Sequence, residues 1–264
     1  MSMLDRIFEG IAEEKAVGGA ANIFVSPNGS DTNNGTLLSP FKSIAKAFKA
    51  VTTSRSRVIL APGTYVETAS LTWPSVNGTS LNGNGAGECI VTAPGATQII
   101  SIDPLAASGT WTAILSNITI SAEDQVGLQV NNTNVGKRIN LFLTKTTFEA
   151  GGDSVGSSID INRAGASSNA IRVYADGEGT TIEGLVTVIT ESTDDRFRFK
   201  GYRLIGGLTV VGAVACEVTL INSGILTSGL TVDGANKLTN VHCWYETDAN
   251  PNVFTVFADA YATY

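Results

Sequence analysis

Short runs of alternating apolar and polar residues recur along most of this chain, and one of them repeats at a fixed interval. The segment from Leu204 to Ala213 returns 22 residues later, from Leu226 to Ala235, with seven of its ten positions identical. A further 22 residues upstream, Ile182 to Val188 keeps the leading aliphatic residue and the closing Thr-Val pair. A period of about 20–30 residues with short apolar strands between turns predicts a solenoid.

The same pattern continues from residue 58 to residue 247 without a convincing helical period. A second pair of similar phrases, Leu115 to Ile120 and Leu143 to Phe148, is offset by 28 residues and indicates a longer coil with loop insertions. We therefore predict an all-β fold, a right-handed single-stranded parallel β-helix of about eight to nine coils spaced ~4.8 Å apart. Leu-x-Asn recurs at three places, and an Asn at a bend tolerates a left-handed backbone while its amide bonds the next coil. The three asparagines are Asn117, Asn222 and Asn240.

Residues 1–21 form a separate N-terminal unit. Its apolar residues follow the i, i+3, i+4, i+7 spacing of one helical face, and a Gly-Gly-Ala-Ala joint ends it. The stripe consists of Leu4, Ile7, Phe8 and Ile11. This pattern predicts an amphipathic docking helix that packs on its own body, on a partner or on a sister subunit. The acidic polar face argues against binding to a membrane surface.

Residues 22–57 combine a strand at Ile23 to Val25, an Asn-Asn-Gly loop and a short helix that starts after Ser39-Pro40-Phe41. Val58 to Tyr65 then follows as strand, Pro-Gly turn and strand. This string resembles the opening module of the pectin-lyase-like superfamily of right-handed parallel β-helices. A solenoid's first coil exposes core side chains and needs a cap, which this helix would supply, with Ser39 as the helix N-cap and Pro40 at the first helical position. The apolar face of this capping helix would be Ile44, Ala47, Phe48 and Val51.

Residues 248–264 change in character after Pro251. Aromatic residues are spaced three, four and three positions apart, so a helix would place them on one stripe, whereas a strand over 253–257 would alternate them. They are Phe254, Phe257, Tyr261 and Tyr264. We predict that this segment closes the far end of the solenoid. Self-association through the same aromatic residues is the alternative.

Composition narrows the functional classes. Charged residues make up 16% of the chain and the net charge is −7, with no basic cluster, which argues against nucleic-acid binding. Cys89, Cys216 and Cys243 lie in apolar phrases and are interpreted as buried thiols, and His242 is the only histidine. We expect no metal, no cofactor and no Cys–His nucleophile. No apolar run reaches ~18 residues, and the start lacks a secretory signal pattern, so no membrane span or export is expected.

A separate question is whether the sequence offers a pair of carboxylates that could cleave a glycosidic bond. A glycoside hydrolase needs two of them about 5–9 Å apart. The densest acidic region offers Glu149, Asp160 and Asp176, with Arg163 and Arg172 nearby. The Trp-x-Asp-His and Arg-x-Pro-x-Arg strings of pectate lyases are absent, and Asp194-Asp195 is expected to balance the basic residues that follow it. We therefore assign no catalytic residue, and these three carboxylates are candidates only if the protein is an enzyme.

Two functions are predicted from the tethered N-terminal helix, the short solenoid and the lack of a secretion signal and of a recognisable active site, together with what the resemblance implies. The first is a structural and interaction protein of a tailed-phage virion, a capsid decoration or head fibre. It would be made in the host cytoplasm, attached to other virion proteins through residues 1–21, homo-oligomeric (a trimer is usual) and able to contact surface glycans. The alternative is a carbohydrate-active β-helix, a polysaccharide lyase or glycoside hydrolase of the tail-spike type.

Overall fold

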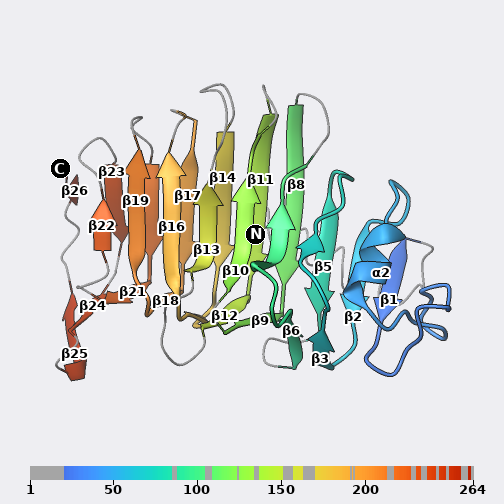
Figure 1. The fold of residues 1–264 in the computed structure, drawn as a ribbon. Coiled ribbons are helices and arrows are strands. Elements are labelled where there is room, and N and C mark those ends of the chain that lie inside the picture. Colours follow the sequence, from blue (N-terminus) through green and yellow to red (C-terminus); the bar gives the residue numbers. More distant parts are fainter. Residues whose placement is uncertain are drawn as a thin grey trace.

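The computed structural model shows the path of the chain through a long stack of short strands (Figure 1). It describes residues 21–256 and 261–262, apart from 85–87, 105–108, 124, 134–136, 151–156, 163–169, 191, 193, 213–216, 227–229, 233–236, 242–243 and 248–249. The predicted N-terminal helix with its docking residues, Cys216, Cys243 and His242 therefore lie outside the described residues.

The described strands form three sheets, which we name A, B and C in the order in which each coil visits them. Sheet A comprises β1 (Asn22–Val25), β2 (Arg57–Leu60), β5 (Thr79–Gly83), β8 (Gly109–Ser116), β11 (Lys137–Thr144), β14 (Ala170–Asp176), β17 (Arg196–Lys200), β20 (Glu217–Ile221), β23 (Lys237–Val241) and β26 (Tyr261–Ala262). Sheet B comprises β3 (Gly63–Val66), β6 (Cys89–Thr92), β9 (Thr119–Ala122), β12 (Thr147–Ala150), β15 (Thr181–Ile182), β18 (Arg203–Leu204), β21 (Gly224–Leu226), β24 (Trp244–Thr247) and β25 (Asn250–Val256). Sheet C comprises β4 (Leu71–Thr72), β7 (Gln98–Ile102), β10 (Val126–Asn131), β13 (Ser157–Asn162), β16 (Leu185–Thr190), β19 (Leu208–Gly212) and β22 (Leu230–Val232).

Each sheet pairs a strand with the corresponding strand of the next coil, in parallel, as a β-helix requires. Within the described part of the chain, seven successive coils give one strand to each sheet, from β2–β3–β4 to β20–β21–β22, and β23 with β24 begins another. Figure 1 shows these coils side by side along one axis, with α2 at one end and β25 and β26 at the other. The predicted parallel β-helix is confirmed.

The sequence repeat corresponds to the stacking of coils. Val186 pairs with Leu208, and Leu208 pairs with Leu230, so residues 22 apart lie on neighbouring rungs of sheet C. The 28-residue offset is confirmed as well, because Leu115 pairs with Leu143. The first residue of the repeat does not follow this 22-residue register. Leu204 lies opposite Ile225 and not opposite Leu226, with which the repeat aligns it. The coil is therefore one residue shorter at sheet B than the sequence alignment indicates.

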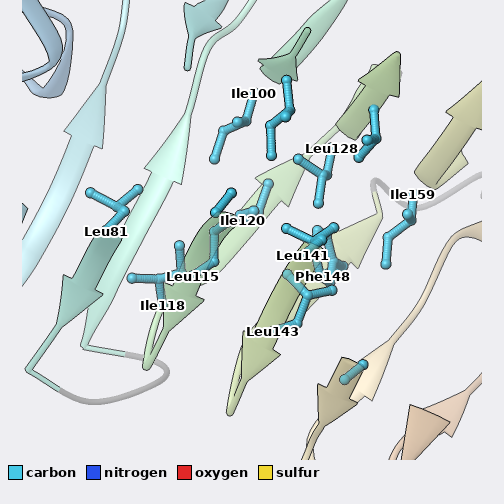
Figure 2. Packing of buried hydrophobic residues seen from close by; sticks show 14 of the residues in the cluster. Leu81, Ile100, Leu115, Ile118, Ile120, Leu128, Leu141, Leu143, Phe148 and Ile159 are labelled. Carbon is cyan, nitrogen blue, oxygen red and sulfur yellow. The ribbon is translucent and has the colours of Figure 1, made fainter. Parts of the chain in front are cut away.

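The core is built from the alternate residues that point inward from all three sheets. Because side chains of a strand alternate between its two faces, in-register stacking places aliphatic residues in columns along the axis. One such column in sheet A contains Leu81, Leu115 and Leu143, all fully buried. Figure 2 shows these leucines facing Ile120 and Phe148 of sheet B and Leu128 of sheet C across the interior. The body thus has one continuous apolar core.

The bend from sheet A to sheet B places a left-handed backbone at corresponding positions of several coils. The backbone φ is 54° at Asn117, 47° at Lys145, 66° at Gly201 and 45° at Asn222. At three of these bends the backbone N–H donates to the next coil: Asn117 to Thr144 O (2.9 Å), Lys145 to Asp176 O (2.8 Å) and Gly201 to Ile221 O (2.8 Å). The bends at Asn117 and Asn222 were predicted, but the bonds come from the main chain and no side-chain amide ladder is needed. Asn240 lies within β23, so its predicted bend is wrong.

The first coil is covered by α2 (Ile44–Lys49), which buries Ile44, Ala47 and Phe48 as predicted. The ring of Phe48 packs edge-on against Trp73, with centroids 5.2 Å apart. The N-cap is Ser43, whose Oγ accepts from Lys46 N, so the prediction of Ser39 was wrong. Ser39 instead closes a tight turn with Thr36. The cause is that Phe41 bridges to Val25, which keeps Pro40 and Phe41 extended and delays the helix.

At the far end the chain reverses direction. β25 pairs antiparallel with β24, and β26 pairs antiparallel with β23. Of the two conformations considered for this segment, the strand is the one observed over residues 250–256. Pairing with the last coil occupies strand edges that would otherwise be open.

Candidate functional site

The three candidate carboxylates lie on three different walls of the β-helix. Glu149 is in β12 of sheet B, Asp160 is in β13 of sheet C and Asp176 is in β14 of sheet A. The structure therefore does not bring them together on one surface. The two-carboxylate arrangement that sugar hydrolysis needs cannot be formed by any pair of these three on a single sheet face.

Asp160 occupies the centre of a polar column on the outer face of sheet C. The pairing register places Gln129 on one neighbouring rung and Thr187 on the other. The column extends through Ser101 at one end and through Thr209 and Thr231 at the other. Burial raises the pKa of the half-buried Asp160 carboxyl, and a hydrogen bond with the Gln129 side chain partly offsets this rise. The column presents carboxyl, amide and hydroxyl groups, which suit a hydroxyl-rich ligand.

A second carboxylate, which the sequence reading missed, lies next to this column. Asp103 is two residues beyond Ser101, so the alternation of the strand keeps it on the same outer side. Its oxygens accept from the hydroxyl of Thr133 at 3.0 and 3.1 Å. Asp103 and Asp160 belong to coils two rungs apart, which separates them by roughly 10 Å along the axis alone. The sequence signal was that Asp103 continues the alternation of polar residues from Ser101 of β7.

Lys137 is a buried cation at the corner where sheet C leads to sheet A. Only 1% of its surface is exposed, and its ammonium donates a hydrogen bond to the carbonyl oxygen of Pro104. Burial lowers the pKa of this lysine, and the negative charge of Asp103 only partly opposes that effect. The buried amide of Asn132 donates to the Lys137 carbonyl at 3.0 Å and fixes the backbone at this corner. A titratable group with such a perturbed pKa is a functional-site candidate.

Asp176 and its acidic neighbours on sheet A are held in ion pairs between coils. Lys200 contacts Asp176 at 2.7 Å, and Lys145 contacts Glu178 at 2.6 Å. Arg138 pairs with Asp194, and Arg196 with Glu217. The expectation that Asp194-Asp195 balances the following basic residues needs correction, because all four of these pairs connect different coils. Asp195 is fully buried and accepts from the backbone N–H of Ile171 at 2.8 Å, so its role there is structural.

The remaining chemistry of the described residues is sparse. Cys89 is a free, buried thiol that accepts from Asn84 N, and burial raises its pKa. In the part of the chain that the structure describes, no group of three or more His, Cys, Asp or Glu residues is placed to hold a metal ion. No described helix is long and apolar enough to cross a membrane.

Three parallel sheets stacked in register around one core define the class: this is a parallel β-helix protein. Residues 27–241 match the model of the family described as "Protein of unknown function (DUF1565)". Because the match spans more than half of the chain, the chain belongs to that family.

No curated protein sequence matches the chain. Among solved structures, a protein described as "Rhamnogalacturonan lyase" is similar over 86% of this chain and 67% of its own length, at 17% identity and a TM-score of 0.36. At that level the similarity says nothing about activity.

Proposed function

We propose that this chain is a structural and interaction protein of a tailed-phage virion, a capsid decoration or head-fibre protein attached through its N-terminal segment. The observation that supports a role without catalysis is the separation of Glu149, Asp160 and Asp176 onto three sheets. Covered ends support a scaffold too, because α2 packs on the first coil and β25 and β26 pair with the last.

Attachment is assigned to residues 1–21 because of their sequence pattern. The stripe of Leu4, Ile7, Phe8 and Ile11 gives one apolar side on an otherwise acidic segment. Such a stripe needs an apolar surface to cover it. In this proposal the surface belongs to another virion protein, and the β-helix body projects from it as a homotrimer.

Deletion of residues 1–17 tests the attachment. We expect the truncated protein to keep its β-rich circular dichroism spectrum and to fail to bind purified virus particles that lack the chain. A double substitution of Ile7→Ser and Phe8→Ser should have the same effect. The matched control, Glu9→Gln with Glu13→Gln, changes the polar side and should bind as the unaltered protein does. Binding that survives the deletion would reject the docking role. Sedimentation should give a mass three times that of the 27.5-kDa chain.

A second function, glycan binding or cleavage, is favoured by the polar column on sheet C. Its members repeat once per coil, and the half-buried Asp160 lies at its centre with a raised pKa. The test is to incubate the protein with a panel of polysaccharides, with and without Ca²⁺, and to measure reducing ends and unsaturated uronates. Turnover that Asp160→Asn abolishes and Asp176→Asn leaves intact would replace the first proposal. Binding without turnover, weakened by the same substitution, would assign the column to glycan recognition.

A further inference from the structure

Two arginines lie side by side in neighbouring coils on the outer face of sheet A. The pairing of β14 with β17 places Arg172 beside Arg196 and Tyr174 beside Arg198. The residues that alternate with these four are buried, so the four side chains point outward. Like charges at directly paired positions destabilise a sheet. An arginine pair at this position therefore calls for a compensating negative charge.

The carboxylates of the same face supply that charge only in part. The outward-facing residues of β11, β14 and β17 include five cations, and three of these form ion pairs within the described part of the chain. These pairs are Arg138 with Asp194 (3.2 Å), Arg196 with Glu217 (3.5 Å) and Lys200 with Asp176 (2.7 Å).

The other two cations of this face are Arg172 and Arg198. Arg172 donates from Nε to the uncharged carbonyl oxygen of Asp194 at 3.4 Å. The Arg198 residue is exposed, and no described residue forms an ion pair or a hydrogen bond with its guanidinium. The face therefore keeps a surplus of two positive charges, although the whole chain has a net charge of −7.

The arginines are close enough to act on one ligand. Paired residues of adjacent rungs are ~4.8 Å apart, and residues two positions apart on a strand are roughly 6.8 Å apart. Arg172, Tyr174, Arg196 and Arg198 thus occupy the corners of a small square, which an arginine side chain is long enough to cross. The ring of Tyr174 stacks on Phe142 of the preceding coil, with centroids 5.1 Å apart and 18° between the ring planes. One side of the square is therefore packed, whereas the side with Arg198 is open to solvent.

We propose that Arg172, Arg196 and Arg198, grouped around Tyr174, bind one doubly charged oxyanion, a sulfate or phosphate group. Guanidinium groups match such anions through parallel N–H···O bonds, and arginine clusters commonly recognise them in proteins. The Nη atoms of Arg172 and the guanidinium of Arg198 provide the donors, Tyr174 adds its hydroxyl, and Arg196 adds charge. The bound anion offsets the repulsion between the paired arginines. This site goes beyond the proposed function, because it lies on a different sheet from the Asp160 column.

Isothermal titration calorimetry of the full chain with sodium sulfate, at low ionic strength, tests the site. We expect saturable binding of one ion per chain and a higher melting temperature in its presence. Arg198→Gln should weaken binding at least about tenfold, because charge-assisted hydrogen bonds are lost. The control, Arg203→Gln, removes an exposed guanidinium from β18 of sheet B and should leave the affinity unchanged. Both variants should melt as the unaltered protein does when no anion is added.

Dextran sulfate distinguishes a free ion from an ester carried by a polysaccharide. Binding per sulfate group at least about tenfold tighter than that of the free ion, and lost in Arg198→Gln, would assign the site to a sulfated or phosphorylated polymer. Equal affinity per group would assign it to the free ion. Three results would overturn the proposal: no saturable binding of either sulfate probe, equal weakening by Arg198→Gln and Arg203→Gln, or equally tight binding of neutral dextran.

Discussion

The carboxylate of Glu67 accepts a 2.7 Å hydrogen bond from the backbone N–H of Ile44, the first residue of α2. Glu67 follows the last residue of β3, and it is 5% exposed. The same carboxylate is within 3.4 Å of Ala45 N. A side chain of the first coil thus supplies acceptors for N–H groups that a helix leaves open at its start. This contact joins the capping helix to the body that it covers.

Removal of this contact should loosen the cap. We expect Glu67→Ala to lower the free energy of unfolding by about 1–3 kcal/mol, because buried N–H groups lose their acceptor. Glu67→Gln keeps an oxygen acceptor and should have a smaller effect. Urea unfolding, followed by tryptophan fluorescence to which Trp73 beneath the helix contributes, measures both. Equal losses in the two variants would show that volume, and not hydrogen bonding, matters at this site.

The pH dependence of Glu67 has a definite sign. Burial raises the pKa of this carboxyl, and the hydrogen bonds from Ile44 and Ala45 only partly offset it. The folded state therefore holds the proton more tightly than the unfolded state, and the group's contribution to stability falls as pH rises through the folded-state value. From about pH 4 to about pH 7, the unaltered protein should lose stability relative to Glu67→Gln. A constant difference would contradict this.

Asp31 should behave in the opposite way. Burial acts to raise its pKa, but hydrogen bonds from Ser43 and Lys42 outweigh that effect, and the pKa is lowered. Its oxygens accept from Ser43 Oγ at 2.7 Å and from Ser43 N at 2.9 Å. We expect Asp31→Asn to destabilise the protein by about 1–2 kcal/mol at neutral pH. This contribution should vanish as pH falls through the lowered pKa, and thermal melting across acidic pH measures it.

Neighbouring residues of one rung should differ sharply in their tolerance of change. Leu208 is fully buried and lies between Val186 and Leu230 of adjacent coils, whereas Thr209 points outward. Leu208→Ala should lower the free energy of unfolding by about 2–5 kcal/mol. Thr209→Ala should change it by no more than about 0.5 kcal/mol. Similar losses, measured by chemical unfolding, would show that this part of the core is not packed in register.

Alanine substitutions at two glycines should distinguish the cost of a left-handed backbone from the cost of steric crowding. Gly95 has φ of 80° and nothing within 4 Å of an added Cβ, whereas Gly201 has φ of 66° and would place a Cβ 3.1 Å from Glu178 N. Gly95→Ala should therefore lose only the conformational term, about 1–2 kcal/mol. Gly201→Ala should lose more, because Glu178 must also shift. If urea unfolding ranks the two variants in the reverse order, the bend at Gly201 is more adaptable than its geometry indicates.

The buried Lys137 should reduce stability near neutral pH. Its pKa is lowered by burial, so folding disfavours the charged form. Lys137→Met, which keeps most of the volume, should leave the free energy of unfolding unchanged or raise it at pH 7. The gap between the two proteins should close as pH rises toward the ordinary lysine pKa of about 10.4, because the unaltered lysine then loses its proton in both states. A large loss of stability in the variant would instead make the lysine a structural member of the corner.

The fold could be predicted from the sequence because stacked coils give the sequence a repeat that can be recognised. Residues that meet across coils, such as Leu208 and Leu230, occupy equivalent sites and keep similar identities at a constant interval. The cap was predictable in outline for a similar reason, since Ile44 and Phe48 show a helical spacing. Its first residue was not predictable, because Phe41 is kept extended by a bridge to Val25 from another element.

The candidate site was harder to predict. Spacing in the sequence does not say which of the three sheets a residue belongs to. Between Glu149 and Asp160 the chain passes from sheet B to sheet C, so the two carboxylates lie on different sheets. Asp103 escaped notice because its hydrogen-bond partner, Thr133, belongs to the following coil. Burial of Lys137 depends on how a corner packs, and a lysine in sequence gives no sign of it.

At the corner between sheets A and B the hydrogen bond to the next coil comes from the main chain, so that bond does not depend on which side chain occupies the position. Asparagine, lysine and glycine all occupy the position, and the backbone follows the same path. Selection can therefore vary that edge freely among residues that accept the left-handed conformation. The corner is a line along which the molecule can acquire new surface chemistry, one coil at a time, while its rungs stay unchanged.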